Sequence, residues 1–322
     1  MSVIETRELR KNYGSVEALK GVSIRVEPGE VYGLLGQNGA GKTTLIKILL
    51  GIVHKTDGEA DLIGQPAGTV NVRQKVGYLP EDHRFPEYHS AFSLMDFYGQ
   101  VYGMSKDDRR RKIPEMLEIV GIKSRMDYRI RTYSKGMKQR LGIAQAMFHN
   151  PQVIFLDEPT DGVDPVGRRE IRDLMERLKG EGKTIFLNSH LLGEVEQICD
   201  RVAILQQGSL ARQGSVAELT QQTNCFVIGL APGQSFPNDD VIRMGYTVAP
   251  AEAFVEVVLP DGKGIDPILS LLQTKGLNLR HLVEKKRSLE DVFVAMVDAA
   301  EPGTDRRARR TREVGAPTKR RK

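Results

Sequence analysis

Residues 31–44 read Val31-Tyr-Gly-Leu-Leu-Gly36-Gln-Asn-Gly-Ala-Gly41-Lys42-Thr43-Thr44, and this stretch decides the fold. Its second half matches G-x-x-x-x-G-K-[ST], a phosphate-binding loop between a strand and a helix. The apolar run before the glycines predicts a buried strand, and the following LIKILLGI predicts a helix. The glycines let backbone N–H groups converge on phosphates, and the helix N-terminus adds partial positive charge. We therefore predict that Lys42 bridges the β- and γ-phosphates of a nucleotide and that the Thr43 hydroxyl binds Mg²⁺.

A second pattern, Val153-Ile-Phe-Leu-Asp157-Glu158-Pro-Thr, places two acids after four apolar residues. The apolar run predicts a buried strand, and ligands of open α/β sheets bind at the carboxyl edge of such strands. Asp157 is suited to hold Mg²⁺, directly or through water, and Glu158 is suited to polarise an attacking water. The alternative is a solvated acidic turn without chemistry.

A third pattern, Tyr133-Ser134-Lys135-Gly136-Met137-Lys138-Gln139-Arg140, lies between the first two. Ser134 can cap a helix that starts at Gly136 or Met137, which would point further N–H groups at an anion. The octapeptide by itself fits an ordinary helix cap. Its position between two phosphate motifs favours a phosphate-related role.

The rest of the chain separates into regions with different patterns of apolar and polar residues. Residues 1–80 have strand patterns with turns, residues 82–150 have helical spacing, and residues 151–206 alternate strands with helices, which predicts a mainly parallel sheet. Residues 222–298 predict a small α+β domain, with Asp266 as the N-cap of one helix and Ser288 opening the last. The composition of residues 299–322 predicts a disordered basic tail.

Composition and charge exclude several classes. The chain has 322 residues, 40% hydrophobic and 28% charged, as in soluble globular proteins of about two domains. No apolar window is long enough to span a membrane, and no signal peptide is expected. Nine Lys/Arg and three acids lie in residues 301–322, so the other residues hold 38 bases and 39 acids. The neutral body argues against a nucleic-acid surface. Cys199 and Cys225 lack metal spacing and are predicted to be plain thiols.

Over residues 1–220 these motifs resemble the ATP-binding subunit of an ABC transporter. The order is that family's: an aromatic residue at Tyr13, the phosphate loop, a helical insertion, the signature, the acidic strand and His190. The usual signature LSGGQ is YSKGM here, which keeps Ser134 and Gly136. This variant of the signature, together with the motifs GYLPE and DEPTDGVDP, resembles the sequences of subunits that serve ABC-2-type exporters. The resemblance implies an α/β P-loop NTPase core with a mainly parallel sheet, an antiparallel β subdomain and a helical subdomain, followed by the small α+β domain.

The resemblance also implies roles for individual residues. Tyr13 would stack on adenine with Val16 nearby, and His190 would contact the γ-phosphate. Ser134 and Gly136 would contact ATP bound to the opposite subunit of a homodimer, and the loop ending at Asp164 would link the two sites. Lys42, Glu158 and His190 form the predicted catalytic set. The predicted nucleotide-binding residues are Tyr13, Val16, Gly36, Gln37, Asn38, Gly39, Ala40, Gly41, Lys42, Thr43, Thr44, Ser134, Gly136 and Asp164.

One position departs from the family pattern. Glu81 stands where Gln is usual, at the junction of core and helical insertion, and we predict it as a Mg²⁺ ligand with Thr43 and Asp157. The following loop is rich in His and aromatic residues. His83 and His89 in this loop could form a metal site. The favoured interpretation is that the loop is an exposed surface that receives a helix of the membrane subunit.

The resulting prediction is an ATPase that uses ATP and Mg²⁺ and closes as a homodimer. It powers export through a separate ABC-2-type permease at the cytoplasmic face of the membrane. A soluble ABC-type ATPase acting on ribosomes or nucleic acid is the alternative, supported only by the basic tail. A nucleotide sensor without catalysis would be expected to lack Lys42, Asp157 or Glu158. The tail itself could contact an anionic membrane or RNA, or remain solvated. The α+β domain is predicted to be a regulatory or dimer-contact module.

Overall fold

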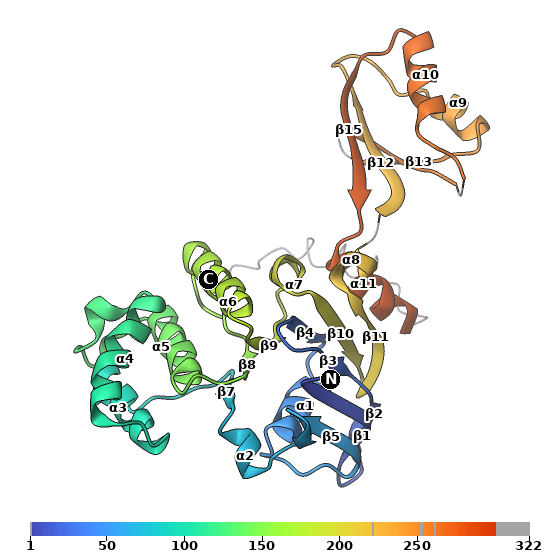
Figure 1. Cartoon of the computed structure of the whole chain (residues 1–322). Helices are drawn as coiled ribbons and strands as arrows, with labels where there is room; N and C mark the ends of the chain where they lie inside the picture. Colours follow the sequence, from blue (N-terminus) through green and yellow to red (C-terminus); the bar gives the residue numbers. More distant parts are fainter. Residues whose placement is uncertain (1, 221, 252–253, 261, 301–322) are drawn as a thin grey trace, which may run out of the picture. The chain divides into compact units, whose positions relative to one another are not determined.

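The structure, a computed structural model, describes residues 2–220, 222–251, 254–260 and 262–300. The chain divides into two compact units, with the boundary between Leu219 and Thr220 (Figure 1). Most of the predicted basic tail, residues 301–322, lies outside the described residues. Within the described part of the chain, no helix combines the length and apolar character needed to cross a membrane.

A six-stranded sheet forms the centre of the first unit, in the order β11-β10-β4-β9-β8-β7. All neighbouring strands are parallel except the β10–β11 pair, which confirms the predicted mainly parallel sheet. The strands are β4 (Val31–Gly36), β7 (Val76–Leu79), β8 (Val153–Asp157), β9 (Thr184–Asn188), β10 (Arg201–Gln206) and β11 (Ser209–Ser215). Every residue of β8 and β9 is buried, as expected for strands covered on both faces.

An antiparallel sheet packs against the same core. It contains β1 (Ile4–Tyr13), β2 (Val16–Val22), β3 (Arg25–Val26), β5 (Asp57–Leu62) and β6 (Gln65–Pro66). Helix α1 (Lys42–Leu49) lies between the two sheets, and its apolar residues share one buried cluster with both. In that cluster Phe186 packs between the rings of Tyr32 and Phe155. The shared core fixes the start of α1 beside the end of β4.

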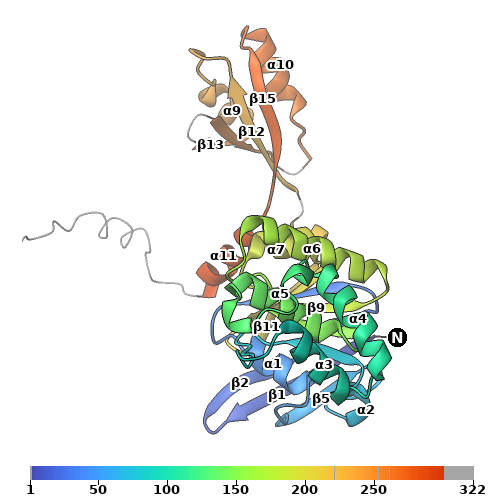
Figure 2. The same cartoon turned by 90° about the vertical axis from the view of Figure 1, so that its left-hand side faces the viewer.

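The helical insertion contains α3 (Ala91–Val101), α4 (Lys106–Ile119) and α5 (Lys135–Met147), which lie together in Figures 1 and 2. Ser134 caps α5 by accepting a hydrogen bond from the Met137 N–H at 3.2 Å. The cap is as predicted, but the helix begins at Lys135 rather than at Gly136 or Met137. The remaining helices are α2 (Val70–Arg73), α6 (Pro165–Gly180), α7 (Leu192–Ile198) and α8 (Val216–Leu219), with 3₁₀ turns at Lys123–Arg125 and Ile130–Thr132.

The second unit has a four-stranded antiparallel sheet in the order β13-β14-β12-β15. Its elements are β12 (Gln222–Leu230), α9 (Asn238–Arg243), β13 (Thr247–Ala251), β14 (Phe254–Val258), α10 (Asp266–Thr274), β15 (Leu279–Lys286) and α11 (Leu289–Ala300). The first six of these elements, β12 to β15, have the βαββαβ order of a ferredoxin-like unit, and α11 follows them. It agrees with the α+β class expected from the sequence.

Two expectations for this unit were wrong in detail. Asp266 is the first residue of α10 rather than its N-cap, because Ile265 occupies the cap position and supplies no side-chain hydrogen bond. Helix α11 includes residues 299 and 300, where the disordered tail was expected to begin. Its start was predicted correctly: the Ser288 hydroxyl accepts from the Asp291 N–H at 3.1 Å, and the Asp291 carboxylate accepts from the Ser288 N–H at 3.0 Å.

Candidate functional site

The phosphate loop connects the carboxyl end of β4 to α1. Gly36 and Gly41 have φ angles of 153° and 102°. A Cβ atom at Gly36 would lie 2.5 Å from the Leu205 carbonyl oxygen, and one at Gly41 would lie 2.6 Å from that of Ala18. Only glycine therefore fits at either position. Gly41 is also the N-cap of α1 and provides no side chain to bond the first N–H groups of the helix, which leaves them available to an anion.

The side chain of Lys42 is held in place by backbone carbonyl groups of the phosphate loop. Its ammonium donates to the Gly36 carbonyl at 2.7 Å and to the Gln37 carbonyl at 3.1 Å. Burial lowers the pKa of Lys42, while the nearby carboxylates of Glu158, Asp157 and Glu81 act in the opposite direction. The ammonium thus lies beside a cluster of acids.

A pocket of about 500 Å³ opens above this loop. Its walls come from β2, the phosphate loop with the start of α1, the segment after β7, and the ends of β8 and β9. They comprise Val16, Glu17, Ala18, Asn38, Gly39, Ala40, Gly41, Lys42, Thr43, Thr44, Glu81, Glu158, Asn188 and His190. Five separate stretches that the sequence analysis singled out, at Val16, the phosphate loop, Glu81, Glu158 and His190, therefore meet at the carboxyl edge of the parallel sheet.

Glu158 lies on the inner wall of this pocket and is 8% exposed. Its carboxylate is 2.8 Å from Nδ1 of His190. Burial raises the pKa of Glu158, and the hydrogen bond with His190 lowers it. A buried carboxylate with a raised pKa, beside an imidazole and facing a phosphate loop, is suited to act as a base toward water.

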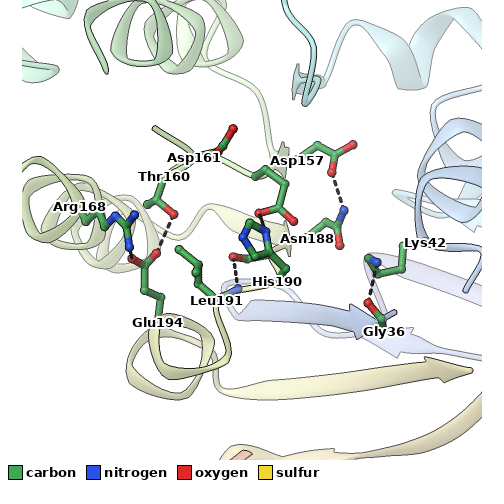
Figure 3. Close-up of polar contacts among 12 residues, drawn as sticks. Gly36, Lys42, Asp157, Thr160, Asp161, Arg168, Asn188, His190, Leu191 and Glu194 are labelled. Carbon is green, nitrogen blue, oxygen red and sulfur yellow. Dashed lines mark hydrogen bonds and ion pairs between the residues drawn. The ribbon is translucent and has the colours of Figure 1, made fainter. Parts of the chain in front are cut away.

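Asp157 lies on β8 directly beside Asn188 on β9, in parallel register. The Asn188 amide donates to the Asp157 carboxylate (Figure 3). Burial raises the pKa of Asp157. The side-chain oxygen of Asn188 is buried and has no hydrogen-bond partner among the residues that the structure describes. Asn188 was not predicted, yet the sequence carried the signal: like Asp157, it is a polar residue that ends an apolar strand.

The oxygen donors of this edge fit Mg²⁺. Thr43, Glu81 and Asn188 line the pocket, and Asp157 contacts Asn188. Among the described residues no group of three or more His, Cys, Asp and Glu side chains forms a metal cage. Mg²⁺ is usually held by one or two carboxylates together with phosphate oxygens and waters, so a sparse oxygen set is the expected arrangement.

The signature residues lie elsewhere on this unit. Ser134 and Gly136 are at the start of α5 and are not part of the pocket wall. Lys135 forms an ion pair with Asp161 at 2.6 Å. Asp164 caps α6 by accepting from the Gly167 N–H at 2.9 Å, so its carboxylate is already engaged in the helix start. Within one chain, Ser134, Gly136 and Asp164 therefore do not line the pocket that contains Lys42.

Tyr13 and Val16 pair at the tip of the β1–β2 hairpin and are 47% and 62% exposed. Val16 lines the pocket, and the ammonium of Lys11 lies 4.8 Å from the centre of the Tyr13 ring. An exposed aromatic ring next to the pocket is available to stack on a base.

The two histidines of the insertion loop have separate partners. The His83 ring contacts the Lys138 carbonyl at 3.2 Å, and the His89 ring contacts the Ser93 hydroxyl at 2.9 Å. Burial lowers the pKa of His83. The structure thus gives no support to a shared metal at this pair. Tyr88 in the same loop is 72% exposed.

Further polar residues around the site were not predicted. The Thr160 hydroxyl donates to Glu194 at 2.7 Å, and Arg168 pairs with the same carboxylate at 3.4 Å (Figure 3). These contacts tie the segment after Glu158 to the first turn of α7, which follows His190. They join residues far apart in the sequence, and the sequence pattern carries no sign of them.

Comparison with known proteins agrees with this geometry. Residues 19–161 match the family described as ABC transporter. An ABC transporter ATP-binding protein from Synechocystis sp. is 46% identical over 72% of this chain and 68% of its own length. This chain belongs to the ABC transporter ATP-binding protein family. It is an ABC-type ATPase subunit, and the predicted fold and family are confirmed.

Two further comparisons extend the match. The Nod factor export ATP-binding protein I from Rhizobium sp. is 32% identical, over 91% of this chain and 96% of its own length, so the similarity includes the second unit. A solved ATP-binding subunit of an ABC transporter superposes with a TM-score of 0.63 at 28% identity, covering 68% of this chain and 92% of that chain.

Proposed function

We propose that this ATPase powers export through a separate ABC-2-type membrane permease, and that ATP closes two copies of it into a homodimer. The resemblance of YSKGM, GYLPE and DEPTDGVDP to that subgroup supports the export role, as does the similarity to a Nod factor export ATP-binding protein. The protein would then lie on the cytoplasmic face of the membrane, bound to its permease.

One observation carries the dimer proposal. The pocket of one chain contains Lys42, Glu158 and His190, whereas Ser134 and Gly136 lie outside it at another helix N-terminus. That N-terminus presents backbone N–H groups suited to a phosphate. A second chain, placed head to tail, would bring its Ser134 to the open side of the pocket. ATP would then be bound between the two copies.

We assign each residue in and around the pocket a separate role in ATP binding and hydrolysis. Lys42 and the loop N–H groups bind the phosphates, and Tyr13 stacks on adenine. Thr43, Asp157 and Glu81 would hold Mg²⁺, which neutralises phosphate charge when bound. Glu158 takes a proton from the attacking water, and His190 orients the Glu158 carboxylate and contacts the γ-phosphate. Glu81 brings one more negative charge than the usual Gln, so Mg²⁺ affinity is the property most sensitive to Glu81→Gln.

The dimer proposal is tested by light scattering of the Glu158→Gln protein with and without Mg-ATP. Removing the carboxylate should block hydrolysis and leave the ATP contacts in place, so a dimer should form only with ATP. Adding Ser134→Arg should abolish this dimer, because a bulky cation replaces the phosphate-binding hydroxyl. Ser105→Arg is the matched control, since Ser105 caps α4 in the same way, accepting from the Asp108 N–H at 3.1 Å. Persistence of the dimer with Ser134→Arg would contradict the composite site.

The pH dependence of hydrolysis should report the contact between His190 and Glu158. A base works only when deprotonated, so kcat should fall as pH drops through the pKa of Glu158. His190 lowers this pKa. In His190→Ala, the acid limb of the kcat profile should therefore move to higher pH. His54→Ala, at an exposed histidine outside the pocket, is the control. An unmoved acid limb in His190→Ala would show that the imidazole does not tune this carboxylate.

For the second unit we propose a regulatory or dimer-contact role. Its ferredoxin-like sheet and the Nod factor export relative's match over nearly the whole chain support treating it as an integral part of the subunit.

A further inference from the structure

The backbone of Glu158 is held in an unusual conformation. Its φ angle is 52°, in the left-handed region that favours glycine. A non-glycine residue stays there only when its surroundings hold it, and such residues cluster at functional sites. The Glu158 N–H donates to the Asn188 carbonyl at 2.8 Å. The Glu158 carbonyl accepts from the Asp161 N–H at 3.2 Å and from the side-chain amide of Gln139 at 2.9 Å.

Gln139 is the one partner in this set that comes from another subdomain. It lies on α5, five positions after Ser134, and is 3% exposed. A buried amide is costly unless it is hydrogen-bonded, so its contact with Glu158 is a strong constraint. Lys135 is four residues earlier on the same face of α5, and it pairs with Asp161 at 2.6 Å. The first turns of α5 therefore contact the Glu158–Asp161 segment at two points.

We propose that Gln139 is a positioning residue for ATP hydrolysis. Its amide holds the Glu158 carbonyl, and so fixes the direction in which the Glu158 side chain leaves the backbone. Through this backbone contact it also ties Glu158 to the helix that begins after Ser134. This inference rests on the proposed function, in which Glu158 acts on water at one ATP while Ser134 contacts the ATP of the partner. Gln139 then links the ATP bound by the partner to the catalytic carboxylate of its own chain.

The first test replaces Gln139 by Met, whose side chain has a similar length and carries no hydrogen-bond donor. The Glu158 carbonyl keeps its bond from Asp161, so the fold should survive. We expect kcat to fall by about 10-fold or more, since small misplacements of a catalytic group have large effects. KM for Mg-ATP and the affinity for a fluorescent ATP analogue should stay unchanged, because Gln139 does not line the pocket. Gln145→Met is the matched control: Gln145 lies on the same helix, is half-buried and does not line the pocket.

The second test uses Gln139→Glu and varies pH. A protonated carboxyl can donate to the Glu158 carbonyl, whereas an ionised one can only repel it. Burial favours the neutral form of the new carboxyl. The kcat of Gln139→Glu relative to wild type should therefore rise as pH falls, while that of Gln139→Met should stay flat. A packing role would give no such recovery at low pH. This readout remains decisive if the Met variant proves unstable.

The outcomes separate this inference from the proposed function. If wild type hydrolyses ATP, Glu158→Gln does not, and both Gln139 variants match wild type, only the positioning role is overturned. It is equally overturned if Gln139→Met loses ATP affinity in step with kcat and Gln139→Glu shows no recovery at low pH. If Glu158→Gln hydrolyses ATP as fast as wild type, the proposed function fails first.

Discussion

Replacing Glu158 by Gln should reduce the rate of Mg-ATP hydrolysis by about 10²- to 10⁴-fold, the range expected when a positioned base is removed. The substitution keeps the shape of the side chain, and an amide can still hydrogen-bond to His190. What it removes is the capacity to accept a proton from water. Because Lys42 and the loop N–H groups are untouched, the affinity for ATP should stay within a few-fold of wild type. Phosphate release under steady-state conditions measures the rate, and isothermal titration measures the binding.

Glu176→Gln provides the matched comparison for this prediction. Glu176 is exposed on α6 and is not part of the pocket wall, and the same atoms change. Its hydrolysis rate should equal that of wild type. Hydrolysis by Glu158→Gln at more than about a tenth of the wild-type rate would show that another group activates the water. Asp157 is the nearest carboxylate along the chain. A further loss of activity in the double variant Asp157→Asn with Glu158→Gln would then identify Asp157 as that group.

The central fold was predictable because its signals are local. Apolar runs with an abrupt polar end predicted β4, β8 and β9, and their parallel order follows from the helices between them. The same rule placed Lys42 and Glu158 at one sheet edge, where the structure brings them into one pocket. Helix caps at Ser134 and Ser288 were equally local. The cap at Asp266 failed because the pattern Asp-Pro fits both the cap position and the first helical turn, and only the backbone decides between them.

The supporting contacts were not predictable because they depend on tertiary packing. Gln139 reaches the Glu158 carbonyl across 19 positions of sequence, and Glu194 reaches Thr160 across 34. Nothing at Gln139 distinguishes it from a solvated residue of an amphipathic helix until α5 is packed on the sheet edge. The role proposed for Ser134 has a different origin. It comes from the family resemblance, and the structure adds only that Ser134 lies outside the pocket of its own chain.

Replacing Lys42 by Met should lower the affinity for ATP by at least about 100-fold, which is more than 2 kcal/mol of binding free energy. Lys42 is the only Lys or Arg among the described residues of the pocket wall, whereas Glu17, Glu81 and Glu158 all belong to it. Without the ammonium, these carboxylates would face the polyphosphate uncompensated in a partly buried site, where charge interactions are weakly screened. The Gly36 carbonyl would also lose the Lys42 ammonium that donates to it at 2.7 Å.

Titration with a fluorescent ATP analogue measures the loss, and Lys106→Met, at an exposed lysine of α4, controls for the change in net charge. The loss should shrink at low pH, because protonation of the acids removes the repulsion that Lys42 normally offsets. Burial raises the pKa of both Asp157 and Glu158, so this recovery should begin above the usual carboxylate range. An affinity loss that is independent of pH would mean that Lys42 acts through direct phosphate contact alone. An affinity equal to wild type would place the phosphates outside this loop and exclude the proposed pocket.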